Sequence, residues 1–182
     1  MTLPGHGNRP FMKKEDFLQS LAELSPQHVV AYSMGGRLAL ESLLYYSARF
    51  LSLTLLSTTV DFDYNERIKK ENVWIEALTA LSTGEFVRYW YSQKIFEGFT
   101  PPESRFTQNK DDLLKVLKEY SITQSPCLKK KPPLAVNYIY RKGDPKAKEV
   151  TGAYFVDGKS HAIHLECIDL IKDFLQARIQ NC

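Results

Sequence analysis

The chain has 182 residues, 43% of them hydrophobic and 25% charged, which is typical of one folded globular unit and excludes a disordered chain. No apolar run approaches the roughly 18 residues of a membrane span, and a net charge of +3 is too small and dispersed to indicate nucleic-acid binding. Three widely spaced cysteines predict neither a disulfide framework nor a zinc site, so the sequence favours a cytoplasmic protein, either monomer or homo-oligomer.

The N-terminal part alternates helices with short apolar strands. Residues 2–7 are rich in Gly and Pro and predict a loop that leaves a strand. Because such alternation is typical of parallel sheets, the sequence predicts an α/β fold with helices on both faces of a mostly parallel sheet. The elements expected in this part are a helix over 11–24, a strand over 27–32, a helix over 37–46 and a strand over 51–56.

The rest of the chain predicts a helical insertion followed by a return to the sheet. Residues 61–131 show apolar side chains at helical spacing and no strand pattern. Strands are expected over 134–140 and 153–156, and a closing helix over 167–179. The predicted organisation is therefore a core in residues 1–60 and 132–182, interrupted by a helical lid over 61–131.

Residues 31–36, Ala-Tyr-Ser-Met-Gly-Gly, are the most informative stretch of the sequence. A strand that bends sharply into a helix needs small residues two before and two after the bend, here Ala31 and Gly35. The pattern predicts Ser33 as a nucleophile, with the backbone N–H of Met34 as an oxyanion donor. Ala31 departs from the G-x-S-x-G pattern, and the alternative is an ordinary strand–helix turn with an exposed serine.

A serine nucleophile needs a general base and a residue that orients the base. Asp144 and two histidines follow later strands, and the order Ser, Asp, His is the order expected in α/β-hydrolases. Spacing alone leaves both His161 and His164 as candidate bases, and Asp144 also fits a simple turn. A metal site built from His161, His164 and Glu166 is a weak alternative, because the spacing lacks helical i, i+4 geometry.

Arginines and aromatic residues suggest what the site would bind. Arg37 lies one helical turn after Ser33, and the insertion contains Arg67, Arg105 and the pair Trp90-Tyr91. Since Arg binds carboxylates bidentately, three converging arginines would suit a substrate with several carboxylates. The alternative is that each arginine lies on the surface over a helix.

On these residues the chain resembles the 2-succinyl-6-hydroxy-2,4-cyclohexadiene-1-carboxylate synthases of menaquinone biosynthesis, which have the α/β-hydrolase fold. Residues 3–7 and 32–37 resemble that family's early loop and nucleophile turn, and Gly143-Asp144 resembles its acid loop. The lid positions that match are Arg67 with Trp74, residues 90–91 and 95–96, and Arg105 followed at four-residue steps by Asn109, Leu113, Leu117 and Ser121.

The resemblance implies a lyase rather than a hydrolase. In that family a proton is removed from the cyclohexene ring of the substrate and pyruvate is eliminated, with no cofactor or metal. The implied substrate is a small polycarboxylate. The resemblance implies that Ser33 abstracts the proton and that His164, as base, and Asp144 complete its triad. It further implies that three arginines bind the carboxylates of the substrate: Arg37, Arg67 and Arg105. The residues implied to line the pocket are Tyr32, Trp90 and Tyr91.

The chain also departs from that family. Thr2 replaces an Asp of the early loop, and the opening strands are absent, including the strand beside the Ser33 strand, whose loop supplies the other oxyanion donor. We therefore expect a shortened form, split at the centre of its sheet, that is unstable or inactive. Two further alternatives stay open: an esterase or thioesterase for small acyl esters, and an inactive hydrolase-like remnant or binding module.

Overall fold

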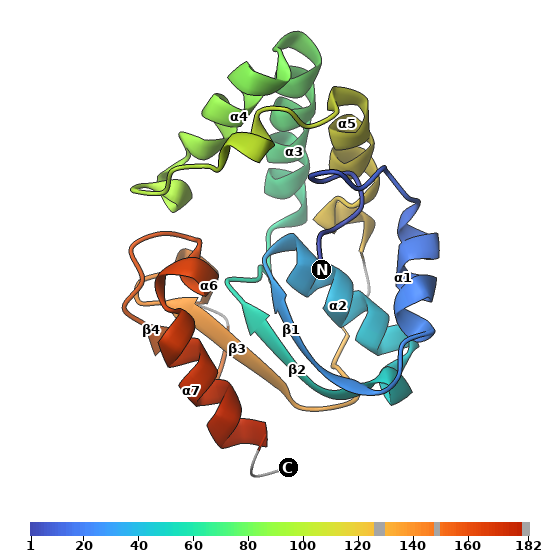
Figure 1. Ribbon diagram of the computed structural model, residues 1–182, viewed down its shortest axis with the longest axis vertical. Helices are drawn as coiled ribbons and strands as arrows, with labels where there is room; N and C mark the ends of the chain where they lie inside the picture. Colours follow the sequence, from blue (N-terminus) through green and yellow to red (C-terminus); the bar gives the residue numbers. More distant parts are fainter. Residues whose placement is uncertain (126–129, 148–149, 180–182) are drawn as a thin grey trace.

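The computed structural model describes residues 1–125, 130–147 and 150–179, without the side chain of Ile179 (Figure 1). Two of the three cysteines, Cys127 and Cys182, lie outside the described residues. Among the described residues, no helix combines the length and the apolar content that crossing a membrane requires.

A four-stranded parallel sheet forms the centre of the fold and confirms the predicted α/β class. The strands pair in the order in which they occur in the chain. The expectation of a sheet split at its centre is wrong, because the described strands form one continuous sheet in which β1 is an edge strand and Val30 is 46% exposed. The strands are β1 (Gln27–Tyr32), β2 (Phe50–Leu56), β3 (Val136–Arg141) and β4 (Tyr154–Val156).

Helices cover both faces of the sheet, as expected. Alternate residues of a strand face opposite sides, so Leu53 and Leu55 of β2 pack with Leu43 of α2 (Met34–Tyr45). Leu56 packs on the other face with Ile163 of α6 (Ile163–Glu166) and with α7 (Ile168–Ile179). Helix α1 (Lys14–Ala22) lies on the outer side of α2 and shares a third cluster with it.

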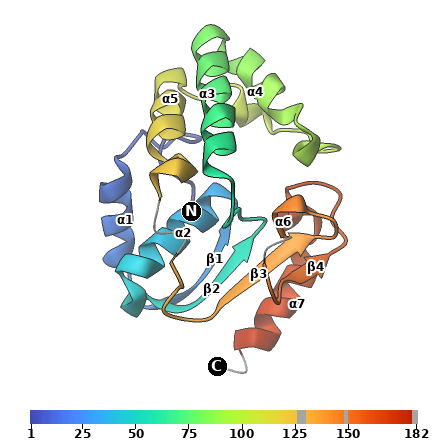
Figure 2. The ribbon, with the colours of Figure 1, turned by 180° about the vertical axis from the view of Figure 1, so that it is seen from behind.

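Three helices lie between β2 and β3, in the segment predicted as a lid, and Figures 1 and 2 show them grouped beyond the carboxyl ends of the strands. They are α3 (Tyr64–Ala80), α4 (Thr83–Tyr91) and α5 (Lys110–Glu119), and Leu78, Phe86 and Leu113 form their shared core. Short 3₁₀ turns complete the chain: η1 (Ser47–Arg49), η2 (Lys94–Phe96), η3 (Glu103–Arg105), η4 (Ile122–Gln124) and η6 (Pro145–Ala147).

The four-residue steps that follow Arg105 do not belong to one helix. Arg105 ends the 3₁₀ turn η3, and Asn109 caps α5 by accepting a hydrogen bond from the backbone N–H of Asp112 at 3.0 Å. Only Leu113 and Leu117 lie within α5, where Leu113 is buried and Leu117 packs beside it. The division into a core and a lid at residues 60 and 131 stays a prediction.

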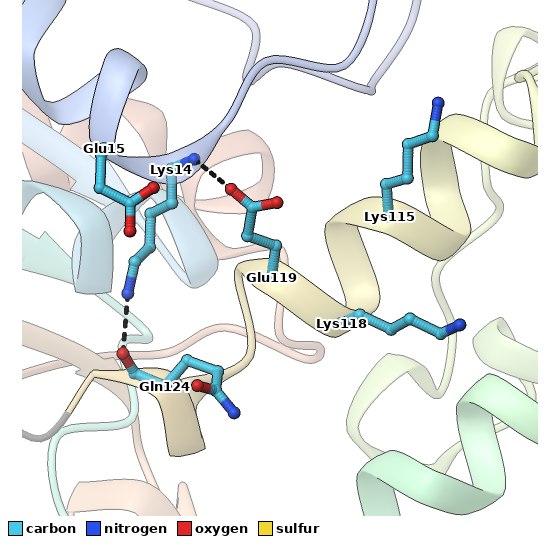
Figure 3. Close-up of a pocket in the computed structure, with 6 residues that line it drawn as sticks. All are labelled: Lys14, Glu15, Lys115, Lys118, Glu119 and Gln124. Atoms are coloured by element: carbon cyan, nitrogen blue, oxygen red, sulfur yellow. Dashed lines mark hydrogen bonds between the residues drawn. The ribbon is translucent and has the colours of Figure 1, made fainter.

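Lys14 connects the first helix to the lid (Figure 3). Its backbone N–H donates to Glu119 Oε1 at 2.6 Å, and its ammonium donates to the Gln124 carbonyl at 2.7 Å and to Glu41 Oε1 at 3.1 Å. Figure 3 also shows the shallow surface pocket beside these contacts, which Glu15, Lys115 and Lys118 complete. None of the residues that line this pocket is among the predicted site residues.

Candidate functional site

Ser33 lies at the bend between β1 and α2 in a strained backbone conformation. Its φ is 51° and its ψ is −116°, a combination that non-glycine residues rarely adopt. The Ser33 N–H donates to the Leu56 carbonyl at 2.9 Å, which ties the bend to the end of β2. Since α2 begins at Met34, the first N–H groups of the helix have no intrahelical partner and lie beside the Ser33 side chain, as an oxyanion donor at Met34 requires.

The glycine on which this bend depends is Gly36 rather than Gly35. A methyl group on Gly36 would collide with the Thr58 side chain, lying 3.0 Å from its Cβ and Cγ2 and still closer to its hydroxyl. A methyl group on Gly35 would meet only the Leu3 side chain at 3.9 Å, an ordinary contact. Helix α2 therefore passes so close to the segment after β2 that no side chain fits at Gly36, the third residue after the serine.

Gly36→Ala is expected to destabilise the protein by about 1–3 kcal/mol, because the added methyl overpacks a fully buried contact. Gly35→Ala is the matched control and should lie within about 1 kcal/mol of the parent, since the space beside it is open. Urea denaturation followed by circular dichroism measures both free energies of unfolding. Equal losses for the two variants would contradict this account of the bend.

The histidine that contacts Ser33 is His161. Its Nε2 lies 2.9 Å from Ser33 Oγ, so the hydroxyl can donate to the ring. His161 is 3% exposed, and its backbone N–H donates to the Ile95 carbonyl of the lid at 2.8 Å. Burial is the main cause that lowers the pKa of His161 to about 3, and Lys146, His164 and Arg141 lower this pKa further. The ring is therefore neutral near pH 7 and able to accept a proton.

His164, which the family resemblance assigns as the base, does not make this contact. It lies one turn further along in α6, with its ring centroid 4.0 Å from the ring of Tyr32. Its buried Nδ1 has no hydrogen-bond partner among the described residues, and burial lowers its pKa. The assignment of His164 as the base is therefore not supported by the geometry. The short helix α6 begins soon after His161, and its turn directs the His164 ring to a different neighbour.

Asp144 is buried in the loop after β3, but among the described residues no hydrogen bond joins it to His161. Its Oδ1 instead accepts the backbone N–H of Lys146 at 3.0 Å.

The Lys146 ammonium lies 3.3 Å and 3.4 Å from the two ring nitrogens of His161, and the sequence analysis did not single this residue out. The only sequence signal for it is a lysine two residues after the candidate acid. Ser33, His161 and Asp144 therefore gather at one place without forming a complete triad.

Glu166 is engaged away from both histidines. Its Oε2 accepts the backbone N–H groups of Lys159 at 2.7 Å and Ser160 at 3.1 Å, and the Ser160 hydroxyl donates to Oε1. These contacts fix the loop between β4 and α6. Within the described part of the chain, no group of three His, Cys, Asp or Glu side chains is placed to hold a metal ion.

Two of the three predicted arginines lie close together. Burial, followed by the nearby charge of Arg67, lowers the pKa of Arg37 to about 10. Arg37 Nη1 reaches the Tyr120 carbonyl at 3.5 Å, whereas Arg67 Nε donates to Glu71 Oε1 at 2.8 Å. Arg67 also lies over the Trp74 ring, 4.8 Å from its centroid, so the predicted pairing of these two residues on one face of α3 is confirmed.

The third arginine, Arg105, approaches the site from the side of Tyr32. Its positive charge acts on Tyr32, His6 and His164, contributing to the lowered pKa of both histidines after the larger effect of burial. Burial, outweighing Arg105, raises the pKa of Tyr32 well above its ordinary value. The arginine charge is thus distributed around the Ser33 site rather than concentrated at one point.

Glu71 is a buried lid residue that the sequence analysis did not single out. Besides Arg67, its carboxylate accepts the hydroxyls of Ser121 and Thr123, the latter at 3.2 Å, and the N–H of Ile122 at 3.4 Å. This network holds Arg67 against the turn that follows α5. Its position four residues after Arg67 is the one sequence signal that could have indicated it.

The aromatic pair of the lid divides between two environments. Trp90 packs in the lid core, 4.8 Å from Trp74 between ring centroids. The Tyr91 ring lies tilted against the Phe96 ring, 4.8 Å apart between centroids, and Phe96 in turn lies edge-on to His161 at 5.5 Å. The lid therefore reaches the Ser33–His161 pair through Phe96 and the Ile95 carbonyl, while Trp90 shapes the lid from within.

Comparison with solved structures identifies the class of fold. The chain superimposes over its whole length on a structure described as MenH from S. aureus, with a TM-score of 0.82, 19% identity and 82% of that chain covered. A carboxylesterase structure from the thaumarchaeon Nitrososphaera gargenis gives a TM-score of 0.66 at 11% identity, with all of this chain and 80% of that chain covered. A marine microorganism esterase gives 0.53 at 18% identity, covering 97% and 81%. The protein has the α/β-hydrolase fold.

Comparison of sequences points to a particular relative within that fold. The chain is 25% identical over 146 residues to the 2-succinyl-6-hydroxy-2,4-cyclohexadiene-1-carboxylate synthase of Photorhabdus laumondii subsp. laumondii, which confirms the resemblance found in the sequence. The match covers 69% of this chain and 52% of the relative, so the chain spans about half the length of the curated protein that it matches. No family model matches the chain.

Proposed function

We propose that this chain carries the site of a carbon–oxygen lyase similar to 2-succinyl-6-hydroxy-2,4-cyclohexadiene-1-carboxylate synthase. The observation that carries the proposal is the 2.9 Å contact between Ser33 Oγ and His161 Nε2, at a strained bend beneath a lid that contains arginines. In the proposed reaction the Ser33 hydroxyl passes its proton to His161, and the Ser33 oxygen takes a proton from the ring of the substrate. The electron pair left on the ring forms a double bond and breaks the carbon–oxygen bond to the leaving group, which departs as the enolate of pyruvate. This enolate takes the proton from His161 and becomes pyruvate, and the proton on the Ser33 oxygen restores the hydroxyl.

The charges around this pair support a substrate with several carboxylates. Arg37 and Lys146 are both half-buried, and the charges of Arg67 and Arg105 act on neighbouring groups. A neutral ester would gain nothing from these half-buried cations, whereas carboxylates would pair with them and reduce the cost of removing them from water. His161 replaces His164 as the proposed base, with Asp144 as a nearby buried carboxylate rather than a direct partner.

Pyruvate release tests the proposal directly. The protein is incubated with the succinyl-cyclohexene carboxylate precursor of the named relative's product, and pyruvate is measured with a coupled lactate dehydrogenase assay. We expect release that Ser33→Ala reduces by about 10³-fold or more, as for loss of a nucleophilic serine. Arg88, which lies over the Phe106 ring in the lid, supplies the control Arg88→Lys, which should leave release unchanged. Release that is indifferent to Ser33→Ala would contradict the proposal.

The second candidate function is hydrolysis of small acyl esters. The two esterase structures that share the fold favour it, because a serine–histidine pair alone suffices for acyl transfer. Turnover of p-nitrophenyl acetate separates the two functions. Strong turnover that Arg37→Met and Arg105→Met leave unchanged would favour the esterase, whereas weak turnover combined with pyruvate release that both variants reduce favours the lyase.

A further inference from the structure

Lys146 lies against the ring of the proposed base, a contact that the proposed function does not use. Its Nζ lies 3.3 Å from His161 Nδ1, 3.4 Å from His161 Nε2 and 3.5 Å from the Ser57 carbonyl oxygen. Nζ is almost equally far from the two ring nitrogens. If it lay in the plane of the imidazole at these distances, it would overlap a carbon atom of the ring. The ammonium therefore lies over the face of the ring. The lysine therefore does not orient the ring as a carboxylate would. It places a positive charge against the proposed base.

Within the described part of the chain, this ammonium has no ion-pair partner. Among the described residues no carboxylate oxygen lies within 4.0 Å of Nζ, since Asp144 binds the Lys146 backbone instead. Burial is the largest cause that lowers the pKa of Lys146 to about 8; Asp144 opposes it, and the charges of Arg67, Arg37 and Arg141 act in the same direction as burial. A half-buried cation with no carboxylate beside it among the described residues is a feature that a carboxylate ligand would complete.

The same charge opposes proton transfer from Ser33. When His161 accepts a proton, two positive charges face each other at about 3.3 Å in a buried site, and His164 and Arg141 add to the repulsion. The arrangement without ligand therefore makes His161 a poor base. An anion placed beside Lys146 would remove this repulsion, whether it neutralises the ammonium in place or draws the four-carbon side chain away from the ring.

We propose that Lys146 receives a carboxylate of the substrate beside Ser33, and that this pairing frees His161 to take the serine proton. This rests on the Ser33–His161 pair of the proposed function, but it extends beyond it, because it makes His161 a stronger base when an anion is bound. A substrate that carries a carboxylate at this position would then activate its own catalyst, and an uncharged ester of similar shape would not.

The test measures His161 directly and requires no turnover. The chain has four histidines, so ¹³C-labelled imidazole signals can be followed by NMR across pH and assigned with His161→Gln. Succinate is the anionic probe and succinamide is its uncharged control. In the parent protein we expect succinate, but not succinamide, to raise the titration midpoint of His161 by about one pH unit or more, the size of shift that a nearby opposite charge produces.

Two variants separate charge from structure. Lys146→Met keeps the apolar stem and should raise the His161 midpoint without ligand, weaken succinate binding about tenfold or more and make succinate ineffective on that midpoint. Lys146→Arg keeps the charge and should retain succinate binding. The proposal would be overturned if the titration midpoint of His161 were unchanged both in Lys146→Met and in the parent with succinate bound. It would also be overturned if Lys146→Met and the parent bound succinate with equal affinity.

These outcomes are distinguishable from failure of the proposed function. If pyruvate release is absent while succinate still moves the His161 midpoint through Lys146, the lyase proposal fails and the anion-dependent base stands. If pyruvate release depends on Ser33, but neither succinate nor Lys146→Met changes the titration midpoint of His161, the proposal of an anion-dependent base is contradicted and the lyase proposal stands.

Discussion

His161→Ala is expected to slow the labelling of Ser33 by an uncharged fluorophosphonate by about 10³-fold or more, the scale of loss seen when a serine nucleophile loses its base. The reason is the 2.9 Å contact of the His161 ring with the serine hydroxyl. Without the ring, the hydroxyl must lose its proton to water at a buried bend. Mass spectrometry of the peptide that contains Ser33 measures the labelling rate.

His164→Ala is the matched control for this experiment. Both histidines belong to the same segment, but the His164 ring contacts Tyr32, and no hydrogen bond joins it to Ser33 among the described residues. We expect labelling within about fivefold of the parent, because only packing against Tyr32 is lost. A large loss in His164→Ala with little loss in His161→Ala would restore the base assigned from the family resemblance and remove the geometric basis of the proposed function.

The strands could be predicted from the sequence because each is a short apolar run with clear limits. The Val-rich run over 27–32 coincides with β1, since Pro26 precedes it and the bend at Ser33 ends it. The next run starts one residue earlier than expected, at Phe50. The third strand begins at Val136 rather than Leu134, because residues after two prolines have no partner on β2 until Val136 pairs with Leu53.

The site could be predicted only to the level of its segments. Loops at the carboxyl ends of parallel strands meet at one edge, and the structure joins Ser33 to His161 there, whereas Asp144 contacts Lys146. Which atoms touch depends on how each loop turns, and the sequence patterns do not encode that. Lys146 shows the limit most clearly, since its position over a ring fifteen residues away depends on the course of two loops.

Contacts between residues far apart in sequence were equally inaccessible. Glu71 gathers donors from Ser121, Ile122 and Thr123, about fifty residues later, and periodicity along α3 gives no sign of it. The pattern around Ser33 did show that small residues are needed at the bend. It could not show that Gly36 is the limiting one, because that depends on the approach of Thr58 from β2.

Lys14→Met is expected to destabilise the protein by about 3–5 kcal/mol, because it leaves the buried carboxylate of Glu41 without its cation. The side chains of Lys14 and Glu41 are 8% and 5% exposed and 3.1 Å apart, so little solvent screens the pair. The ammonium also donates to the Gln124 carbonyl at 2.7 Å, and this contact joins α1 to the turn after α5 (Figure 3). Urea denaturation followed by tryptophan fluorescence measures the loss.

The double variant Lys14→Met/Glu41→Leu separates the unpaired charge from the loss of packing. It replaces both charged groups with apolar ones, so its loss should be smaller than that of Lys14→Met, even though Ser125 then loses the carboxylate to which it donates at 2.7 Å. Exposed pairs are the second comparison: Lys142→Met breaks a 2.8 Å pair with Asp157 whose side chains are 65% and 76% exposed, and it should cost under about 1 kcal/mol. A double variant that is less stable than Lys14→Met would contradict this account, because Glu41 without its cation would then stabilise the fold instead of destabilising it.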